Sequence, residues 1–398
     1  MSNVTQKKST KNKETSKYNI TSYQMTAIIA STIIGVSVLT LPRSSTEKAH
    51  QMGWISILFA LLISLLGMLV MNKLLVRFPG KTLVDILAEL LGSRKKPWVG
   101  RVLSMPFSLI YFAYWAWLTG MVLRTFGEVV VTAVLVNTPL EVIVLTMLLL
   151  CFSLSYYDVE VVSRVNETLL LLIVIPVIAL AVSAYQTAHL DFILPLFSLR
   201  HMSGILHSTV TAMTSLFGFE VLMMFNSHLS HDRHMLRAQL IGVLLPGMIY
   251  LLIVIAGIMA FGYEELSRQA WPTLELVKTT QVPGLVLERL EAVFLGVWVA
   301  AVFTTAGNWF YCANWIMNAL ISRKKRTWWS SVLLFGTVYL IAMTPRNVED
   351  LFHYWEWIGY AGFATTFLLP LLFLIFAMIR RLDHRQQEGG ETDAQAAS

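Results

Sequence analysis

Cysteine and charged residues are both scarce in this sequence. The chain of 398 residues has only two cysteines, Cys151 and Cys312, and both lie in apolar segments without a CxxC pattern or a histidine at ligand spacing. Neither a disulfide framework nor a zinc site is therefore expected. Charged residues make up only 14% of the chain, whereas 56% of it is hydrophobic and the mean hydropathy is +0.63. Because the apolar residues run along nearly the whole length, the composition predicts a membrane protein with many spans.

Several recognisable motifs are also missing. The N-terminal stretch MSNVTQKKSTKNKETSKYNIT has no short apolar run before a cleavage site, so we expect the first span, not a signal peptide, to target the chain. Without a nucleotide loop, a nucleophile triad or a zincin motif, we expect no enzyme activity and no cofactor. His228, His231 and His234 have helical spacing, but Asp232 is the only carboxylate supporting them, and we expect no metal there.

Ten segments are long and apolar enough to cross a bilayer as helices, which satisfy their own backbone hydrogen bonds in lipid. They lie near residues 24–42, 53–72, 104–135, 140–156, 167–185, 204–228, 238–262, 288–320, 328–344 and 354–379. The predicted domain organisation is a polar cytoplasmic tail at residues 1–23, a membrane domain at 24–380 and a polar cytoplasmic tail at 381–398.

Positive charge gives the predicted orientation. With the N-terminus inside, 22 Lys and Arg residues fall on the cytoplasmic side, including the SRKKRT loop, and 7 fall outside. Cytoplasmic loops carry such an excess, so both termini are expected in the cytoplasm. The net charge of +6 could suggest nucleic acid, but the basic residues lie in short loops between spans. We therefore expect the lipid bilayer as the partner, and no nucleic acid.

Spans one and six carry the strongest sign of an inverted repeat of five spans each. Span one contains STIIGVSVLTLP, in which Gly35 is followed by Val36 and Ser37, residues that favour a helix only weakly. Span six contains MTSLFGFEVLMMF, with Gly218 near its middle. We expect an all-α membrane fold in which both spans unwind at these glycines and expose backbone groups to a mid-membrane pocket. Close helix packing is the alternative explanation for Gly35.

Glu220 follows the glycine of span six directly. We expect Leu216, Gly218, Phe219 and Glu220 to line the pocket. A charged side chain at the bilayer centre costs roughly 3 kcal/mol, which is tolerable only beside a cavity, a partner or a proton. Glu220 either takes part in ligand binding and coupling or braces span six against its neighbours, and the sequence leaves both interpretations open.

Four further stretches make a family resemblance specific. FGFE resembles the sixth span of the amino acid, polyamine and organocation transporter superfamily, whose spans one and six unwind around the substrate. ITSYQ leading into LTLPR, RFPGKTLVDIL after span two, WPTLELVK before span eight and ERLEAVF opening it together resemble the endospore germination permease family. The resemblance implies an inner-membrane spore subunit, the B subunit of a germinant receptor, which senses a small nutrient beside A and C subunits.

Spans three and eight supply further candidates. Thr304 and Thr305 lie halfway along span eight, at the depth where related transporters hold a sodium ion. Their hydroxyls suit a hard cation, but they could equally line the pocket or bond to their own backbone. In span three, Tyr111 shares a helix face with Tyr114 and Trp115, and we expect Tyr111 and Tyr114 to line the pocket.

Two features are interpreted as structural. Arg124 and Glu128 stand four residues apart in span three and are expected to neutralise each other. FPGKTL is typical of a turn at the inner interface, followed by the amphipathic helix LVDILAELLG. Contact with a partner is an open alternative for that segment.

The sequence therefore predicts a receptor subunit that binds a small nutrient between spans one, three, six and eight. An amino acid is the favoured class of nutrient. A secondary amino acid transporter coupled to a proton or cation is the main alternative, because the same fold serves both. A purely structural scaffold, which would bind no small ligand, is the third.

Overall fold

Helices make up nearly all of the computed structural model, which describes residues 19–92, 97–229, 234–279, 290–321 and 328–382. The predicted tails and the SRKKRT loop lie mostly or wholly outside these residues. The first half of the chain contains α1 (Ser22–Ile33), α2 (Ser37–Ala49), η1 (His50–Met52), α3 (Gly53–Leu75), α4 (Leu83–Leu91), α5 (Pro97–Ala133), α6 (Leu140–Leu154) and α7 (Val159–Ser183). Three short turns, η2 (Ala184–Thr187), η3 (Leu190–Ile193) and η4 (Leu199–His201), lead into the second half.

The second half contains α8 (Met202–Thr214), η5 (Phe219–Val221), α9 (Leu222–Phe225), η6 (Asn226–His228), α10 (Met235–Arg268), α11 (Pro272–Thr279), α12 (Leu290–Ile321), α13 (Trp328–Ala342), α14 (Val348–Phe363), the π-helical turn η7 (Ala364–Leu368) and α15 (Leu369–Ile379). We call α1 with α2 the first broken helix, α8 with η5–η6 the second broken helix, and Phe219–His228 the 219–228 segment. Within the described ranges there is no β-strand, only one parallel β-bridge between Ile20 and Leu229.

Each of the ten predicted spans coincides with a helix or a broken pair. In the described part of the chain, six helical stretches are long and apolar enough to cross a membrane, or seven if the bent pair Met202–Thr214 and Phe219–His228 is one span. The helices α6 and α13 are shorter, at 15 residues each. Several helices extend beyond the predicted spans. The outer half of span one runs to Ala49, and spans three and five begin at Pro97 and Val159. Hydropathy detects the part of a helix in hydrocarbon, whereas a helix continues where its polar residues reach water.

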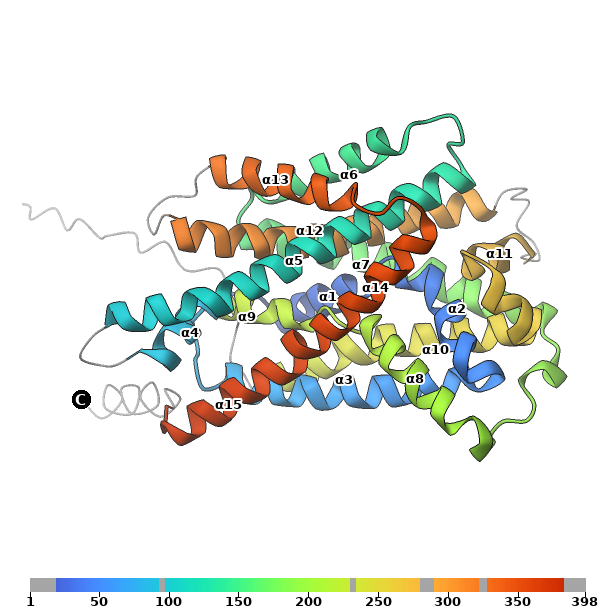
Figure 1. Ribbon diagram of the computed structural model, residues 1–398, viewed down its shortest axis with the longest axis horizontal. Coiled ribbons are helices and arrows are strands. Elements are labelled where there is room, and N and C mark those ends of the chain that lie inside the picture. The colour runs from blue at the N-terminus through green and yellow to red at the C-terminus, as the bar shows by residue number, and fades with distance from the viewer. Residues whose placement is uncertain (1–18, 93–96, 230–233, 280–289, 322–327, 383–398) are drawn as a thin grey trace, which may run out of the picture.

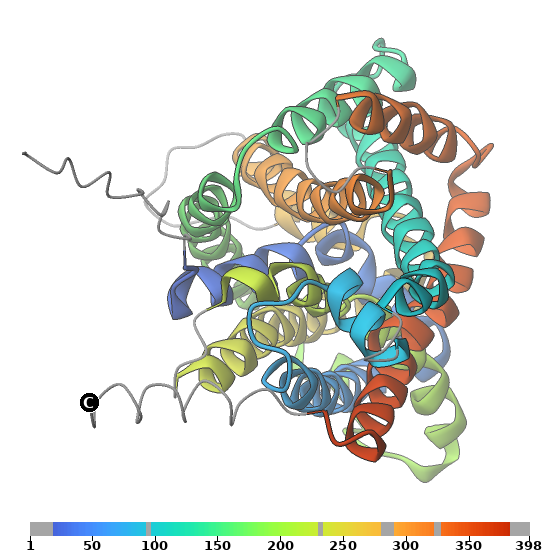
Figure 2. The same ribbon diagram turned by 90° about the vertical axis from the view of Figure 1, so that its left-hand side faces the viewer.

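The two halves repeat the same order of elements with opposite orientation. Each half begins with a broken helix, continues with a long one (α3, α10), and then has a short helix outside the spans (α4, α11) before the next long one (α5, α12). In Figure 1, α4 lies at the left end of the bundle and α11 at the right end. We call these the α4 end and the α11 end. Figure 2 looks at the α4 end, where the long helices are seen nearly along their axes. This arrangement confirms the predicted five-plus-five inverted repeat.

Local sequence explains how individual helices start. Thr21 caps α1, because its side chain accepts from Gln24 N while Gln24 Oε1 accepts from Thr21 N, both at 3.2 Å. The predicted amphipathic helix is α4, which packs against α5. The predicted ion pair in α5 is also present, with Arg124 Nη2 2.8 Å from Glu128 Oε1. Both the predicted amphipathic helix and the predicted ion pair are thus present.

Candidate functional site

The first broken helix is interrupted at Ile34 and Gly35, between the end of α1 and the start of α2. The break leaves carbonyl oxygens without helical partners, and side chains of other helices donate to them. Tyr250 Oη donates to the Ile33 oxygen at 2.7 Å, and Trp298 Nε1 donates to the Gly35 oxygen at 3.3 Å. The sequence predicted the break but neither donor, because they arrive from α10 and α12.

Thr305 of α12 closes the same break. Its hydroxyl lies 2.9 Å from the Ser31 oxygen and 3.2 Å from the Ile34 oxygen. Gly35 packs directly on it, since a Cβ at this position would lie 2.7 Å from Thr305 Oγ1. The Thr304 hydroxyl bonds to its own helix at 2.9 Å and also approaches the Ser31 oxygen at 3.3 Å. The threonine pair therefore caps the broken helix, and a cation beside it stays a prediction.

A network of buried amides holds the first broken helix to α7 and α12. Asn166 Nδ2 donates to Asn308 Oδ1 at 2.9 Å, and Asn308 Nδ2 donates to Asn166 Oδ1 at 2.8 Å and to Thr32 Oγ1 at 2.7 Å. The Ser31 hydroxyl also donates to Asn166 Oδ1. All four side chains are fully buried. Fully bonded polar networks of this kind rigidify their surroundings. The sequence signals for this network were Asn308, inside the apolar span eight, and Asn166, directly before span five, and neither was predicted as a site residue.

The second broken helix is interrupted between Thr214 and Phe219, where its two parts bend by 42°. Gly218 has φ +136°, a conformation that residues with a side chain rarely adopt. A Cβ on Gly218 would lie 3.1 Å from Thr32 Cγ2 and 3.3 Å from the Ile33 amide nitrogen. The breaks in the two helices therefore lie against each other, as the predicted repeat requires.

Glu220 is fully buried at this contact and accepts three hydrogen bonds. Its Oε2 accepts from the Gly218 amide at 2.7 Å, and its Oε1 accepts from Trp115 Nε1 at 3.3 Å and from Trp309 Nε1 at 3.1 Å. All three partners are N–H donors, which suits an acceptor-only carboxylate. The carboxyl group thus holds the amide that the break frees, and joins it to α5 and α12. Neither indole was predicted as its partner.

The tyrosines of α5 meet η7, the π-helical turn in the last span. Tyr111 Oη donates to the Thr365 oxygen at 2.6 Å. Tyr114 lies beside Thr366, yet in the described part of the chain neither the Tyr114 phenol nor the Thr366 hydroxyl, both buried, has a hydrogen-bond partner. Because π-helical turns are frequent at functional sites, the last span joins the candidate site, which the sequence did not predict.

The remaining predicted residues surround the two breaks. Val36 is the N-cap of α2, and Ser37, partly buried, is its first residue, beside the phenol of Tyr250. Leu216 lies in the second break and Phe219 directly after it, and both are fully buried. The structure therefore brings the predicted residues into one region, where the polar groups of the breaks are already bonded to neighbouring helices.

Solved structures with a similar fold are transporters. The crystal structure of MhsT in complex with L-phenylalanine has a TM-score of 0.63 at 13% identity, and the match covers 89% of this chain and 88% of that one. Mhp1, a nucleobase-cation-symport-1 family transporter in a closed conformation with bromovinylhydantoin bound, has a TM-score of 0.59 at 12% identity, covering 88% of this chain and 78% of that one. At these identities the likeness shows the fold alone.

Proteins with similar sequences show the family to which the chain belongs. Spore germination protein A2 of Bacillus subtilis (strain 168) is 26% identical over 365 residues, which are 91% of this chain and 97% of the relative. Spore germination protein B2 of the same organism is 26% identical over 375 residues, 94% and 99% of the two chains. The family model described as "Spore germination protein" matches residues 19–351, which include both broken helices and Glu220. The chain is thus a multi-pass membrane protein and belongs to the spore germination protein family.

Proposed function

We propose that this chain is the B subunit of a spore germinant receptor, and that it binds a small nutrient where its two broken helices meet. The observation that carries the proposal is the contact between the two breaks, with Gly218 against α1 and the buried Glu220 bonded across it to α5 and α12. In related folds, half-helix ends of this kind face the substrate at mid-membrane. MhsT, which has a similar fold, was solved with L-phenylalanine, which supports an amino acid as the ligand.

The proposed ligand is small because little space separates the parts of this region. Gly35 lies directly against Thr305, and Gly218 lies against Thr32. Glycines, hydroxyls and nearby tyrosines suit a small amino acid. Binding would change the packing of the breaks, and a ligand shifts an equilibrium only through its different affinities for two states. The proposed partners are the A and C subunits of the receptor, and the proposed location is the inner membrane of the spore, with both tails in the cytoplasm.

A secondary amino acid transporter coupled to a proton or cation is the second candidate, supported by the transporters that share the fold. Purified protein in proteoliposomes separates the two. With a panel of labelled amino acids and an imposed proton or sodium gradient, a receptor subunit binds its ligand without accumulating it, whereas a transporter fills the vesicles. If no amino acid binds or accumulates, the proposed ligand class is wrong.

A further inference from the structure

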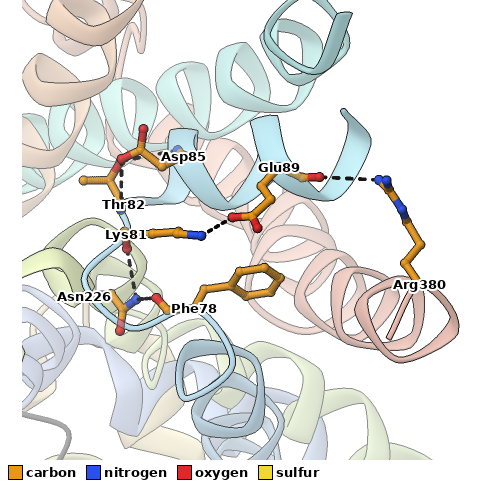
Figure 3. Close-up of polar contacts among 7 residues, drawn as sticks. All are labelled: Phe78, Lys81, Thr82, Asp85, Glu89, Asn226 and Arg380. Carbon is orange, nitrogen blue, oxygen red and sulfur yellow. Dashed lines mark hydrogen bonds and ion pairs between the residues drawn. The ribbon is translucent and has the colours of Figure 1, made fainter. Parts of the chain in front are cut away.

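Asn226 lies at the α4 end, in η6 near the end of the 219–228 segment. Asn226 is fully buried, and its side-chain Nδ2 donates to the Phe78 oxygen at 2.7 Å and to the Lys81 oxygen at 2.9 Å. These two carbonyls belong to the FPGK turn between α3 and α4 (Figure 3). One amide group therefore holds both ends of the turn, and each of its two hydrogens has an acceptor.

The FPGK turn is itself anchored to the rest of the bundle through α4. Thr82 and Asp85 form a capping box at the start of α4, and the Lys81 ammonium pairs with the Glu89 carboxylate on the same helix (Figure 3). At the other end of α4, Arg380 from the end of α15 donates to the Leu90 oxygen, and also to the Gly92 oxygen at 2.6 Å. The turn is thus joined to α4, which packs on α5 and is bonded to α15.

The start of the first broken helix is hydrogen-bonded to the end of the 219–228 segment. Ile20 N, just before α1, donates to the His228 oxygen at 2.7 Å, and Ile20 forms the β-bridge with Leu229. The α4-end parts of both broken helices are therefore linked by backbone. In the second of them, the side chain of Asn226 reaches the FPGK turn.

We propose that Asn226 and the FPGK turn form a clasp that fixes the position of the 219–228 segment. This segment has a hinge at one end, the break at Gly218, and the clasp at the other. Glu220 lies beside the hinge, so a change at the ligand site would move the segment against the clasp. Asn226 is a positioning residue, and the α4–α15 layer is the element to which it transmits that movement. The proposed transmission of a change at the ligand site rests on the proposed function. The existence of the clasp does not depend on that function.

The experiment uses the full chain in liposomes and needs no germinant. Cys151 and Cys312, both buried, are replaced by alanine, and Ser227→Cys places one reporter thiol beside the clasp. The rate of labelling with N-ethylmaleimide is then measured with and without Asn226→Asp, a near-isosteric change that removes both N–H donors. We expect the rate to rise on the order of tenfold, the factor to which about 1.4 kcal/mol corresponds.

Two controls separate a clasp from general loosening. Asn318, whose amide donates within α12 at 2.8 Å, is also nearly buried, and Asn318→Ala should leave labelling at the Ser227→Cys reporter unchanged. A second reporter, Ser267→Cys near the end of α10 at the α11 end, is partly buried like Ser227 and should label at the same rate with and without Asn226→Asp. Equal rates at the Ser227→Cys reporter with and without Asn226→Asp, or equal increases at both reporters, would overturn the proposal.

If the Asn226→Asp protein does not accumulate, Arg380→Gln tests the clasp from its other anchor. This change weakens the bond between α15 and α4, and we expect a rise of about threefold at the Ser227→Cys reporter. No rise there would equally overturn the proposal. Because the readout is labelling without ligand, the clasp can fail while the germinant receptor function stands, and the reverse also holds.

Discussion

Glu220→Gln is the substitution whose effect the structure specifies most closely. Glutamine has nearly the same shape, but its side chain offers one acceptor oxygen and one NH₂ group, which donates. If the amide oxygen faces Trp115 and Trp309, the NH₂ group faces the Gly218 amide, and two donors meet. If the amide is flipped, the Gly218 bond survives and both indole bonds are lost. Either way the variant cannot keep all three bonds of the carboxylate.

The expected cost follows from these bonds. A hydrogen bond to a charged group contributes about 1.5–3 kcal/mol, and a buried donor left without a partner costs about 1–3 kcal/mol. We therefore expect a loss of about 3 kcal/mol at the break, which corresponds to roughly a 100-fold change in a local equilibrium. If that equilibrium links ligand binding to the change of state, the variant should accumulate normally, but its nutrient dose curve should shift by up to about 100-fold.

The assay compares spores that carry the receptor with Glu220→Gln and with the matched control Glu167→Gln. Glu167 accepts a single bond from Gln24 Nε2 at 2.8 Å, and a glutamine oxygen can replace its acceptor. Abundance is measured by immunoblot, and germination by dose curves over several pH values. Normal abundance with an unshifted curve at every pH would refute the coupling role, and loss of the protein would instead favour bracing of the fold.

Three further outcomes are expected. Gly218→Ala should lower the accumulation of the protein or abolish its response, because strain at such a backbone conformation costs about 1–3 kcal/mol and the new Cβ crowds α1; a wild-type response would contradict the required geometry. Gly35→Ala should abolish the nutrient response while the subunit still accumulates, and adding Thr305→Ala should restore part of the response, because it makes room for the new Cβ. Equal defects in the single and double variants would argue against direct contact between positions 35 and 305. Cysteines at Asp85 and Lys278, both exposed, should label from opposite sides of the membrane, and labelling from one side would contradict the predicted topology.

The sequence predicted the frame of the molecule well because that frame depends on local signals. Apolar runs located all ten helical segments, and the glycines of spans one and six located both breaks. Gly218 has a positive φ, which only a glycine adopts easily, so its place in an apolar run was informative. The Thr82 cap and the amphipathic pattern after it located α4.

The sequence did not predict the partners that close the site, since they are brought together by the fold. Trp298 and Tyr250 cap the first break from helices more than 200 residues along the chain, and Trp115 and Trp309 meet at Glu220 from α5 and α12. No local spacing relates such residues. The π-helical turn at η7 was missed for a different reason, because a single extra residue in a helix leaves the hydropathy pattern almost unchanged.

The central claim is that a nutrient acts where the two broken helices meet. The most direct test uses spores with this receptor as their only one, exposed to a panel of single nutrients, with the wild-type subunit and with Gly35→Leu. The account predicts that one or a few small amino acids trigger the wild-type spores, and that the Gly35→Leu spores keep the subunit but do not respond. An unchanged dose response in the Gly35→Leu spores would contradict it.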